Sequence, residues 1–258
     1  MMISRFFRFI GQRTITFFRE FGGINVLIGR IIVNLKHFFK DWDLFIEQCM
    51  QIGVQALPLV TVVSIFAGAV SSWQAAYQLQ GLMPLDYLGS AAGKAILLEM
   101  GPVLTGLVIA GRNGASIAAE IGTMHVTEQI DALESMGIDP VRYLAVPRVL
   151  AATIMIPVVV VYADTIAMGG AFLVANVFYD QAPNIFFNTF RLYFLPIDLI
   201  MSIAKGFVFG FSTALLGVYV GLRTRGGAKG VGSAAIRSFV YSSATILIMD
   251  FILATVIL

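Results

Sequence analysis

The sequence predicts an all-α integral membrane protein, with an N-terminal interfacial helix, about five transmembrane helices and a short cytoplasmic helix between two of them. Of its 258 residues, 58% are hydrophobic and only 12% are charged, and the mean hydropathy is +0.86. Soluble domains carry about 25% charged residues, so this chain has too few to cover a water-facing surface. Five long apolar runs support the same class. We expect one domain over residues 1–258, with an interfacial region at 1–50 and a transmembrane bundle at 51–258.

The first forty residues predict a helix that lies in the headgroup plane of the membrane. They carry seven basic side chains against the single acid Glu20, and phenylalanines are interleaved with them. The basic residues are Arg5, Arg8, Arg13, Arg19, Arg30, Lys36 and Lys40, and the aromatic ones include Phe6, Phe7, Phe9, Phe17, Phe18 and Phe21. Such a segment is attracted to anionic lipid. Beside so much lipid-seeking sequence, the other use of a basic arm, nucleic-acid binding, is not expected.

Five apolar runs are long enough to cross a bilayer, which takes about 20 residues in a helix. They cover about 54–77, 88–110, 149–178, 197–222 and 239–258. Pro58, Pro102 and Pro157 fall inside these runs, where we expect them to kink the helices rather than end them.

The distribution of basic residues orients the helices, because cytoplasmic loops are enriched in lysine and arginine. The N-terminal forty residues, the 112–148 connection and the 222–237 stretch together hold fourteen such residues. The opposite side holds two, Lys94 and Arg191. We therefore expect a cytoplasmic N-terminus, five spans and a C-terminus at the far face.

Small residues recur at every fourth position in three of the spans. These faces are Gly68, Ser72 and Ala76; Gly106, Ala110, Gly114 and Ala118; and Gly206, Gly210 and Ala214. Small faces let helix backbones approach closely in lipid. We expect some of them to pack within the subunit and one to form a dimer contact.

The connection at 112–148 is too long and too patterned for a simple turn. Thr127 is placed to act as an N-cap with Glu128 in the first turn, and Gly137 followed by Asp139-Pro140 supplies a stop. These signals predict a helix of about ten residues on the cytoplasmic side. The helix has an apolar stripe and an acidic one, made of Ile130, Leu133 and Met136 and of Glu128, Asp131 and Glu134.

An amphipathic helix between two spans suits docking into a groove on another protein. Packing on its own bundle and lying on the bilayer are the alternatives. Acidic residues near an anionic leaflet argue against the bilayer, so we favour docking.

Six short motifs lie between residues 99 and 151. They read Glu99-Met-Gly-Pro-Val-Leu, Ala110-Gly-Arg-Asn-Gly-Ala, Ala119-Glu-Ile-Gly-Thr-Met, Thr127-Glu-Gln-Ile-Asp-Ala-Leu, Met136-Gly-Ile-Asp-Pro and Pro147-Arg-Val-Leu-Ala. In these motifs, and over essentially its whole length, the chain resembles the MlaE/YrbE family. Members of this family are permease subunits of ABC transporters that maintain lipid asymmetry.

The resemblance implies a homodimer in the bacterial inner membrane that carries two cytoplasmic ATPase subunits. It also implies a periplasmic partner with lipid-binding MCE domains and phospholipid as cargo, and it makes 127–137 the coupling helix that receives ATP-driven motion. Some family members carry an arginine just before the glutamate of the second span. Here that position is Leu98, so a headgroup role for the arginine does not transfer.

Glu99 lies in an apolar helix, about 16 Å from its outer end at 1.5 Å per residue. An acid inside the membrane indicates function, because burying its charge is costly. We predict that Glu99 and the neighbouring Leu98 line a lipid-binding cavity, with packing across the bundle as the alternative. Ser71, Gln74 and Gln78 share one face of the first span and are expected to form the opposite wall.

Lys205 and Asp250 are predicted to form an intramembrane ion pair. Each lies about 12–14 Å from the outer end of its span, and opposite charges at one depth in lipid should pair. Asp164 is the less favoured acid. The expected role of the pair is structural, with a proton relay as the alternative.

No nucleotide- or metal-binding motif is found. The glycines at 89 and 93 before Lys94 have the wrong spacing for a phosphate-binding loop, and no Ser or Thr follows the lysine. Cys49 is the only cysteine and the two histidines are isolated, so no catalytic or metal site is predicted. We expect no cofactor in this chain, with ATP and Mg²⁺ on the partner ATPase. A self-contained ion-coupled transporter is the alternative function, and a lipid-modifying membrane enzyme is a second.

Overall fold

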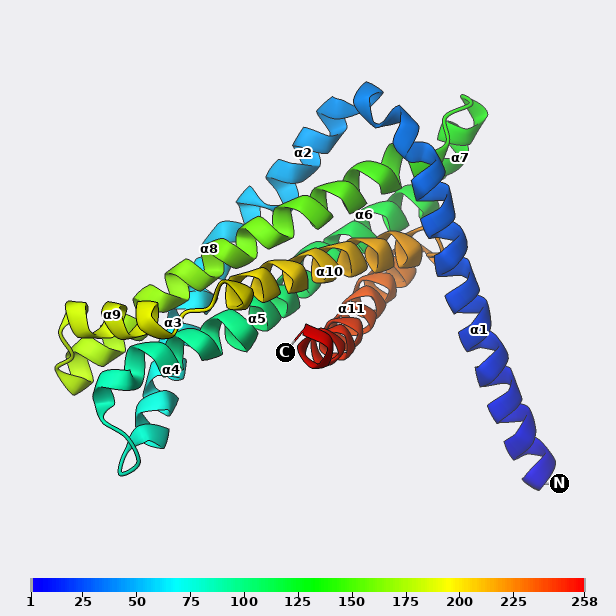
Figure 1. Cartoon of the computed structure of the whole chain (residues 1–258). Coiled ribbons are helices and arrows are strands. Elements are labelled where there is room, and N and C mark those ends of the chain that lie inside the picture. Colours follow the sequence, from blue (N-terminus) through cyan, green and yellow to red (C-terminus); the bar gives the residue numbers. More distant parts are fainter. Residues whose placement is uncertain (1, 258) are drawn as a thin grey trace.

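Five helical segments long and apolar enough to cross a membrane form a bundle in the computed structural model of the chain (Figure 1). Within the described residues these spans are Trp42–Leu79, Leu85–Val126, Val141–Tyr179, Pro196–Gly221 and Gly227–Val256. The structure describes residues 2–257, and the side chains of 14–256 except 16, 17, 37 and 39. No strand occurs among them, which confirms the predicted all-α membrane class. The predicted contributions of Arg5, Arg8, Arg13, Phe6, Phe7, Phe9 and Phe17 lie outside the described side chains.

Three spans are assembled from several consecutive helical pieces, and two are continuous. The first comprises α2 (Trp42–Ile52), the 3₁₀ turn η2 (Val54–Ala56) and α3 (Leu57–Leu79). The second comprises η3 (Leu85–Tyr87), α4 (Leu88–Ala95), the π turn η4 (Ile96–Met100), α5 (Gly101–Ile109), the π turn η5 (Ala110–Gly114) and α6 (Ala115–Val126). The π turn η6 (Val141–Ala145) leads into α8 (Val146–Tyr179), and α10 (Pro196–Gly221) and α11 (Gly227–Ile257) are the last two spans.

Four shorter or peripheral elements complete the chain: α1 (Met2–Asn34), the 3₁₀ turn η1 (Leu35–Lys40), α7 (Gln129–Ser135) and α9 (Pro183–Tyr193). The first, second, third and fifth spans begin or end beyond the apolar runs that predicted them. The reason is that hydropathy marks where a helix contacts lipid, whereas the hydrogen-bonded helix continues past that level into polar residues.

The three prolines act differently from one another. Pro58 and Pro102 occupy the first turn of α3 and α5, each just after a turn of non-α geometry. A proline in the first helical turn removes only an N–H that has no partner within the helix. Pro157 lies within α8, which is assigned as one helix from end to end. The spans thus continue through Pro58 and Pro102, with a local change of helical geometry just before each proline, and the kinks stay a prediction.

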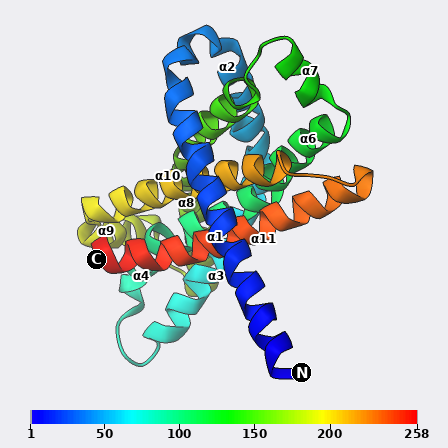
Figure 2. The same ribbon diagram turned by 90° about the vertical axis from the view of Figure 1, so that its right-hand side faces the viewer.

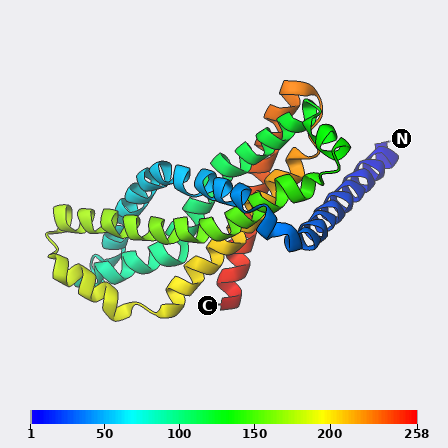
Figure 3. The same cartoon turned by 90° about the horizontal axis from the view of Figure 1, so that it is seen from above.

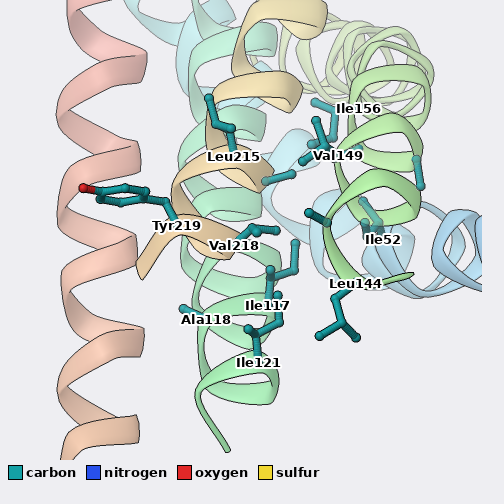
Figure 4. Packing of buried hydrophobic residues seen from close by; sticks show 14 of the residues in the cluster. Ile52, Ile117, Ala118, Ile121, Leu144, Val149, Ile156, Leu215, Val218 and Tyr219 are labelled. Carbon is teal, nitrogen blue, oxygen red and sulfur yellow. The ribbon is translucent and has the colours of Figure 1, made fainter. Parts of the chain in front are cut away.

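The largest core lies between α2, α6, α8 and α10. Figure 4 shows Ile117 and Ile121 of α6 beside Val149 and Ile156 of α8 and Val218 of α10, all of them buried. A second cluster joins α3, α4, α8 and α9 at the other end of the bundle, around Leu88, Ala171 and Phe186. The long helices are thus packed against one another at both ends of the bundle.

The three small-residue faces all pack within the chain. A Cβ atom at Gly68 would collide with the backbone of Ala167, and one at Gly206 or Gly210 would meet the backbone of α8. The second-span face packs on α10, where Gly106 meets Phe209 and Gly114 meets Thr213. The expectation that one of these faces makes a dimer contact is wrong, because neighbouring helices of the same chain already occupy them.

The helix α1 leaves the bundle at an angle, so that the N-terminus stands clear of it (Figures 2 and 3). Its second half is anchored: Leu27 and Ile31 are buried in the main core, and the hydroxyl of Tyr219 donates to the carbonyl oxygen of Glu20 at 3.0 Å. The guanidinium of Arg223 stacks over the Tyr219 ring, 4.3 Å from its centroid. This arrangement suits the predicted interfacial helix, which attaches at one end of the bundle.

Candidate functional site

The predicted docking helix exists, but it is shorter than expected and begins two residues later. α7 covers Gln129–Ser135, and Glu128 precedes it in the left-handed conformation at φ 59°. Thr127 is therefore not its N-cap. It is instead the C-terminal cap residue of α6, and its hydroxyl donates to the Thr123 carbonyl at 2.8 Å. The reason is that α6 extends to Val126, which places Thr127 in its C-terminal turn.

The stop after α7 is built from the predicted residues. Gly137 adopts φ 75°, and the Ile138 N–H donates to the Leu133 carbonyl at 3.0 Å, which closes a left-handed C-terminal cap. Asp139 then starts the next span, because its Oδ1 accepts the N–H of Val141 at 3.0 Å. The two ends of this segment are thus fixed by local hydrogen bonds.

Each face of α7 has a different environment. Ile130 is buried in the main core and Leu133 is half-buried against it, so these two hold α7 to its own bundle. Glu128, Asp131 and Glu134 are exposed, and the Met136 side chain just beyond α7 is 66% exposed. Packing on the bundle therefore uses only part of the apolar stripe. The acidic edge and Met136 are free for another protein.

Asp139 and Asp41 tie the segment after α7 to the N-terminal elements. Arg30 Nη2 of α1 lies 2.9 Å from Asp139 Oδ1, and the Asn34 side chain donates to Asp139 Oδ2 at 2.9 Å. Arg142 forms a bidentate ion pair with Asp41, with hydrogen bonds of 2.8 and 3.0 Å. The α1 helix and the start of the third span are therefore linked directly to the segment that carries α7.

Lys205 is the centre of a charge network inside the bundle. Its side chain is fully buried, and its Nζ lies 2.6 Å from Asp250 Oδ1 of α11 and 3.0 Å from Glu99 Oε1 of η4. It also donates to the Leu98 carbonyl oxygen at 2.6 Å. The structure thus brings the predicted pair Lys205 and Asp250 together, and it adds Glu99 as a second carboxylate.

The Leu98 carbonyl is open to Lys205 for a local reason. In an α-helix it would accept the N–H of the residue four positions on, but that residue is Pro102, which has none. The π turn η4 widens the helix at this point. A carbonyl oxygen and a carboxylate are therefore presented together to one ammonium group.

Asp164 belongs to a separate site. It is buried, and its Oδ2 accepts the hydroxyl of Ser202 at 2.6 Å. Its other oxygen lies against Gly101, where a side chain would collide with it. Asp164 lines an apolar cavity of about 460 Å³ with Leu97 and phenylalanines of α9. It is not a partner of Lys205.

The five residues predicted to line one lipid cavity are placed in different surroundings in the single chain. Ser71 is buried, with its hydroxyl 3.5 Å from the Ala92 carbonyl, whereas Gln74 and Gln78 are exposed. Leu98 is half-buried and the Glu99 side chain is 48% exposed. A cavity that includes Glu99 therefore needs a wall from outside this chain, and its existence stays a prediction.

Two contacts were missed from the sequence. The first is the contact of Glu99 with Lys205. The sequence places Glu99 about 16 Å and Lys205 about 12–14 Å from the outer end of their spans, so their similar depths already indicated that they could pair. The Arg30–Asp139 link carries no such signal, because it joins residues 109 positions apart in polar segments.

Comparisons with known proteins agree on one family. The family described as Permease MlaE matches residues 45–256. A probable ABC transporter permease protein of Rickettsia felis is 36% identical over 244 residues, which cover 95% of this chain and 94% of that protein. The corresponding protein of a Synechocystis species is 36% identical over 228 residues, with 88% and 87% covered. Protein TRIGALACTOSYLDIACYLGLYCEROL 1, chloroplastic, of Arabidopsis thaliana is 30% identical over 232 residues, with 90% and 66% covered.

Proposed function

The chain belongs to the Permease MlaE family, and from this premise we propose that it moves phospholipids between the bacterial inner membrane and a periplasmic MCE-domain carrier. In this proposal it acts as a homodimer, with two cytoplasmic ATPase subunits that bind ATP and Mg²⁺. It crosses the inner membrane several times, with its N-terminus in the cytoplasm and its C-terminus at the periplasmic face.

The observation that carries the proposal is the position of α7 at the end of the bundle where basic residues concentrate. The Ile130 side chain fixes it there, while Asp131, Glu134 and Met136 remain exposed. An exposed acidic and apolar edge on a rigid helix is a suitable contact for a groove on an ATPase. In this proposal a displacement of α7 would reach α1 through Asp139, which bonds Arg30, and the ion pair of Arg142 with Asp41 ties the start of the third span to the start of the first.

The charge network supports a homodimer with a polar cavity. Glu99 is paired with buried Lys205, yet about half of its side chain is exposed at a depth where the surroundings of a lone chain would be hydrocarbon. Exposing a carboxylate to hydrocarbon is costly. A second copy that encloses Glu99 in a water-containing cavity removes that cost and provides a place for a polar headgroup. One relative is named after a galactolipid, which favours lipid as cargo.

Purification of the tagged chain from its native membrane tests the proposal. We expect a P-loop ATPase, an MCE-domain protein and phospholipid to be recovered with it, with two copies of the chain per complex. Recovery of the chain without an ATPase after gentle extraction would contradict the proposal and favour the self-contained ion-coupled transporter. Ion flux in liposomes that contain only this chain would be the measurement to make next.

A further inference from the structure

A polar cavity of about 130 Å³ lies between α2 and the η5–α6 stretch, away from both α7 and the Lys205 network. One water molecule needs about 10–15 Å³ of such a volume, so the cavity has room for a small polar group. Its lining includes the side chains of Gln48, Gln51, Gln55, Arg112, Ser116 and Glu120. A cavity with so many donors inside a membrane bundle is not accounted for by helix packing.

The cavity exists because the first span breaks at Gly53. α2 ends at Ile52 and η2 begins at Val54, so the last carbonyls of α2 lack helical donors. The side chain of Asn113 donates to the Ile52 carbonyl at 2.8 Å, and Arg112 Nη1 donates to the Gln51 carbonyl at 3.3 Å. The π turn η5 presents both side chains. These bonds hold the Arg112 guanidinium at the wall of the cavity.

The Arg112 guanidinium has hydrogen-bond donors that are not used within the chain. Nη1 is also bonded to Asn113 Oδ1 at 2.9 Å, whereas Nε and Nη2 have no acceptor among the described residues. Of the arginines and lysines whose side chains the structure describes, Arg112 is the one that is neither exposed nor within 4.0 Å of a carboxylate. A half-buried guanidinium with free N–H groups favours an anion, and the planar fork of arginine matches phosphate.

The one acid of the cavity is already neutralised. Glu120 Oε2 lies 3.3 Å from Arg148 Nη2, and Oε1 accepts from Gln51 at 3.1 Å and from Ser116 at 2.8 Å. Arg148 and Glu120 cancel, so the cavity keeps the positive charge of Arg112. The exposed Gln55 adds an amide donor with no partner in the described chain.

The cavity also lies at the level of the lipid headgroups. The apolar run of the first span starts at about 54, that of the second ends at about 110, and that of the third starts at about 149. Gln51, Arg112 and Arg148 stand just beyond these three limits. All three side chains therefore lie where hydrocarbon gives way to the polar layer on the basic, cytoplasmic side.

We propose that the Arg112 cavity binds the phosphate group of an anionic ligand at the cytoplasmic leaflet, either the headgroup of a phospholipid or free phosphate. The guanidinium Nε and Nη2 donate to two phosphate oxygens, and the amides of Gln48 and Gln55 donate to the others. The proposal does not depend on transport, because binding at this site needs no ATP and no partner chain.

Native mass spectrometry of the purified complex tests the proposal with dioleoyl phosphatidylglycerol as the probe. We expect Arg112→Gln to weaken binding about tenfold or more, since a hydrogen bond to a charged group contributes about 1.5–3 kcal/mol. Arg225→Gln is the matched control, because Arg225 is exposed on the same basic side and forms no ion pair among the described residues. It should bind the probe as the unmodified chain does. Dioleoylglycerol, which lacks the phosphate, should not distinguish the variants.

A second variant covers the case in which Arg112→Gln fails to fold. Gln55→Glu leaves the bonds of Arg112 to the α2 carbonyls intact and places a carboxylate in the cavity, so it should also weaken binding about tenfold. Inorganic phosphate at millimolar concentration identifies the source: displacement of the lipid supports a site open to free phosphate, and its failure to displace supports a headgroup site. Unchanged lipid binding in a folded Arg112→Gln or Gln55→Glu chain would overturn the proposal. Equal losses of lipid binding in Arg112→Gln and Arg225→Gln would also overturn it. So would an Arg112→Gln complex that loses its ATPase but still binds the lipid.

Discussion

The buried ammonium of Lys205 donates a hydrogen bond of 2.6 Å to the carbonyl oxygen of Leu98. Pro102, four residues further along the second span, leaves this carbonyl without its helical donor. The Leu98 carbonyl is therefore one of three oxygens around the Lys205 ammonium, and the carboxylates of Glu99 and Asp250 supply the other two. The same contact joins the second, fourth and fifth spans at one point, so the loss of Lys205 affects all three.

Replacement of Lys205 by methionine should destabilise the chain by about 3–5 kcal/mol, because it leaves Asp250 as a largely buried charge without a partner. Adding Asp250→Asn to the Lys205→Met chain should recover part of the loss, since the uncompensated charge is then removed. Thermal unfolding in detergent, followed by tryptophan fluorescence, measures the difference. A double variant no more stable than Lys205→Met alone would show that the unpaired charge of Asp250 is not the cause of the loss.

Substitution of Gly170 by alanine should loosen the contact between α3 and α8. A Cβ there would collide with the carbonyl oxygen of Ile65, and overpacking of this kind typically costs about 1–3 kcal/mol. Gly169→Ala is the matched control, because its Cβ would have nothing within 4 Å. Alanine favours helix over glycine by up to about 1 kcal/mol, so the control should be neutral or slightly stabilising. The melting temperatures of the Gly170→Ala and Gly169→Ala chains measure the difference. Equal values would refute the close contact between α3 and α8 at Gly170.

Reversal of the acidic edge of α7 should separate the chain from its ATPase. Asp131→Lys combined with Glu134→Lys changes two exposed side chains and leaves buried Ile130 in place. Like charges across an interface oppose association strongly, so we expect the recovered ATPase to fall about tenfold or more at unchanged amounts of the chain. Asp43→Lys, a reversal of an exposed acid at the start of α2, is the control. Full recovery of the ATPase with the α7 variant would place the contact elsewhere.

Loss of the Asp139 carboxylate should release the end of α1. Asp139→Ala removes the bonds to Arg30 and Asn34 and also the cap on the Val141 N–H, with an expected loss of about 1–2 kcal/mol. Asparagine retains an oxygen for the cap, so Asp139→Asn should lose less than about 1 kcal/mol. Hydrogen exchange of residues 24–34 should accelerate in the alanine variant first. Identical exchange in all three chains would mean that the link does not hold α1.

The sequence alone determined the features that depend on local composition and on chain direction. Apolar runs located all five spans, because a bilayer requires about 20 consecutive apolar residues whatever the neighbouring helices do. Gly137 and Asp139-Pro140 located the end of α7, because left-handed caps and proline act within a few residues. The pairing of Lys205 with Asp250 followed from depth, since a helix rises by a constant 1.5 Å per residue.

Only the tertiary structure decided which surfaces meet. All three small-residue faces look alike in sequence, but the first packs on α8, the second on α10 and the third, on α10 itself, packs on α8. Glu99 meets Lys205 from the π turn η4, where the second span departs from the regular helix that sequence periodicity assumes. The Arg112 cavity depends on the break at Gly53 lying beside η5, 61 residues away along the chain from Gln51 to Arg112. Such contacts between distant segments depend on how the helices pack, which local residue patterns do not specify.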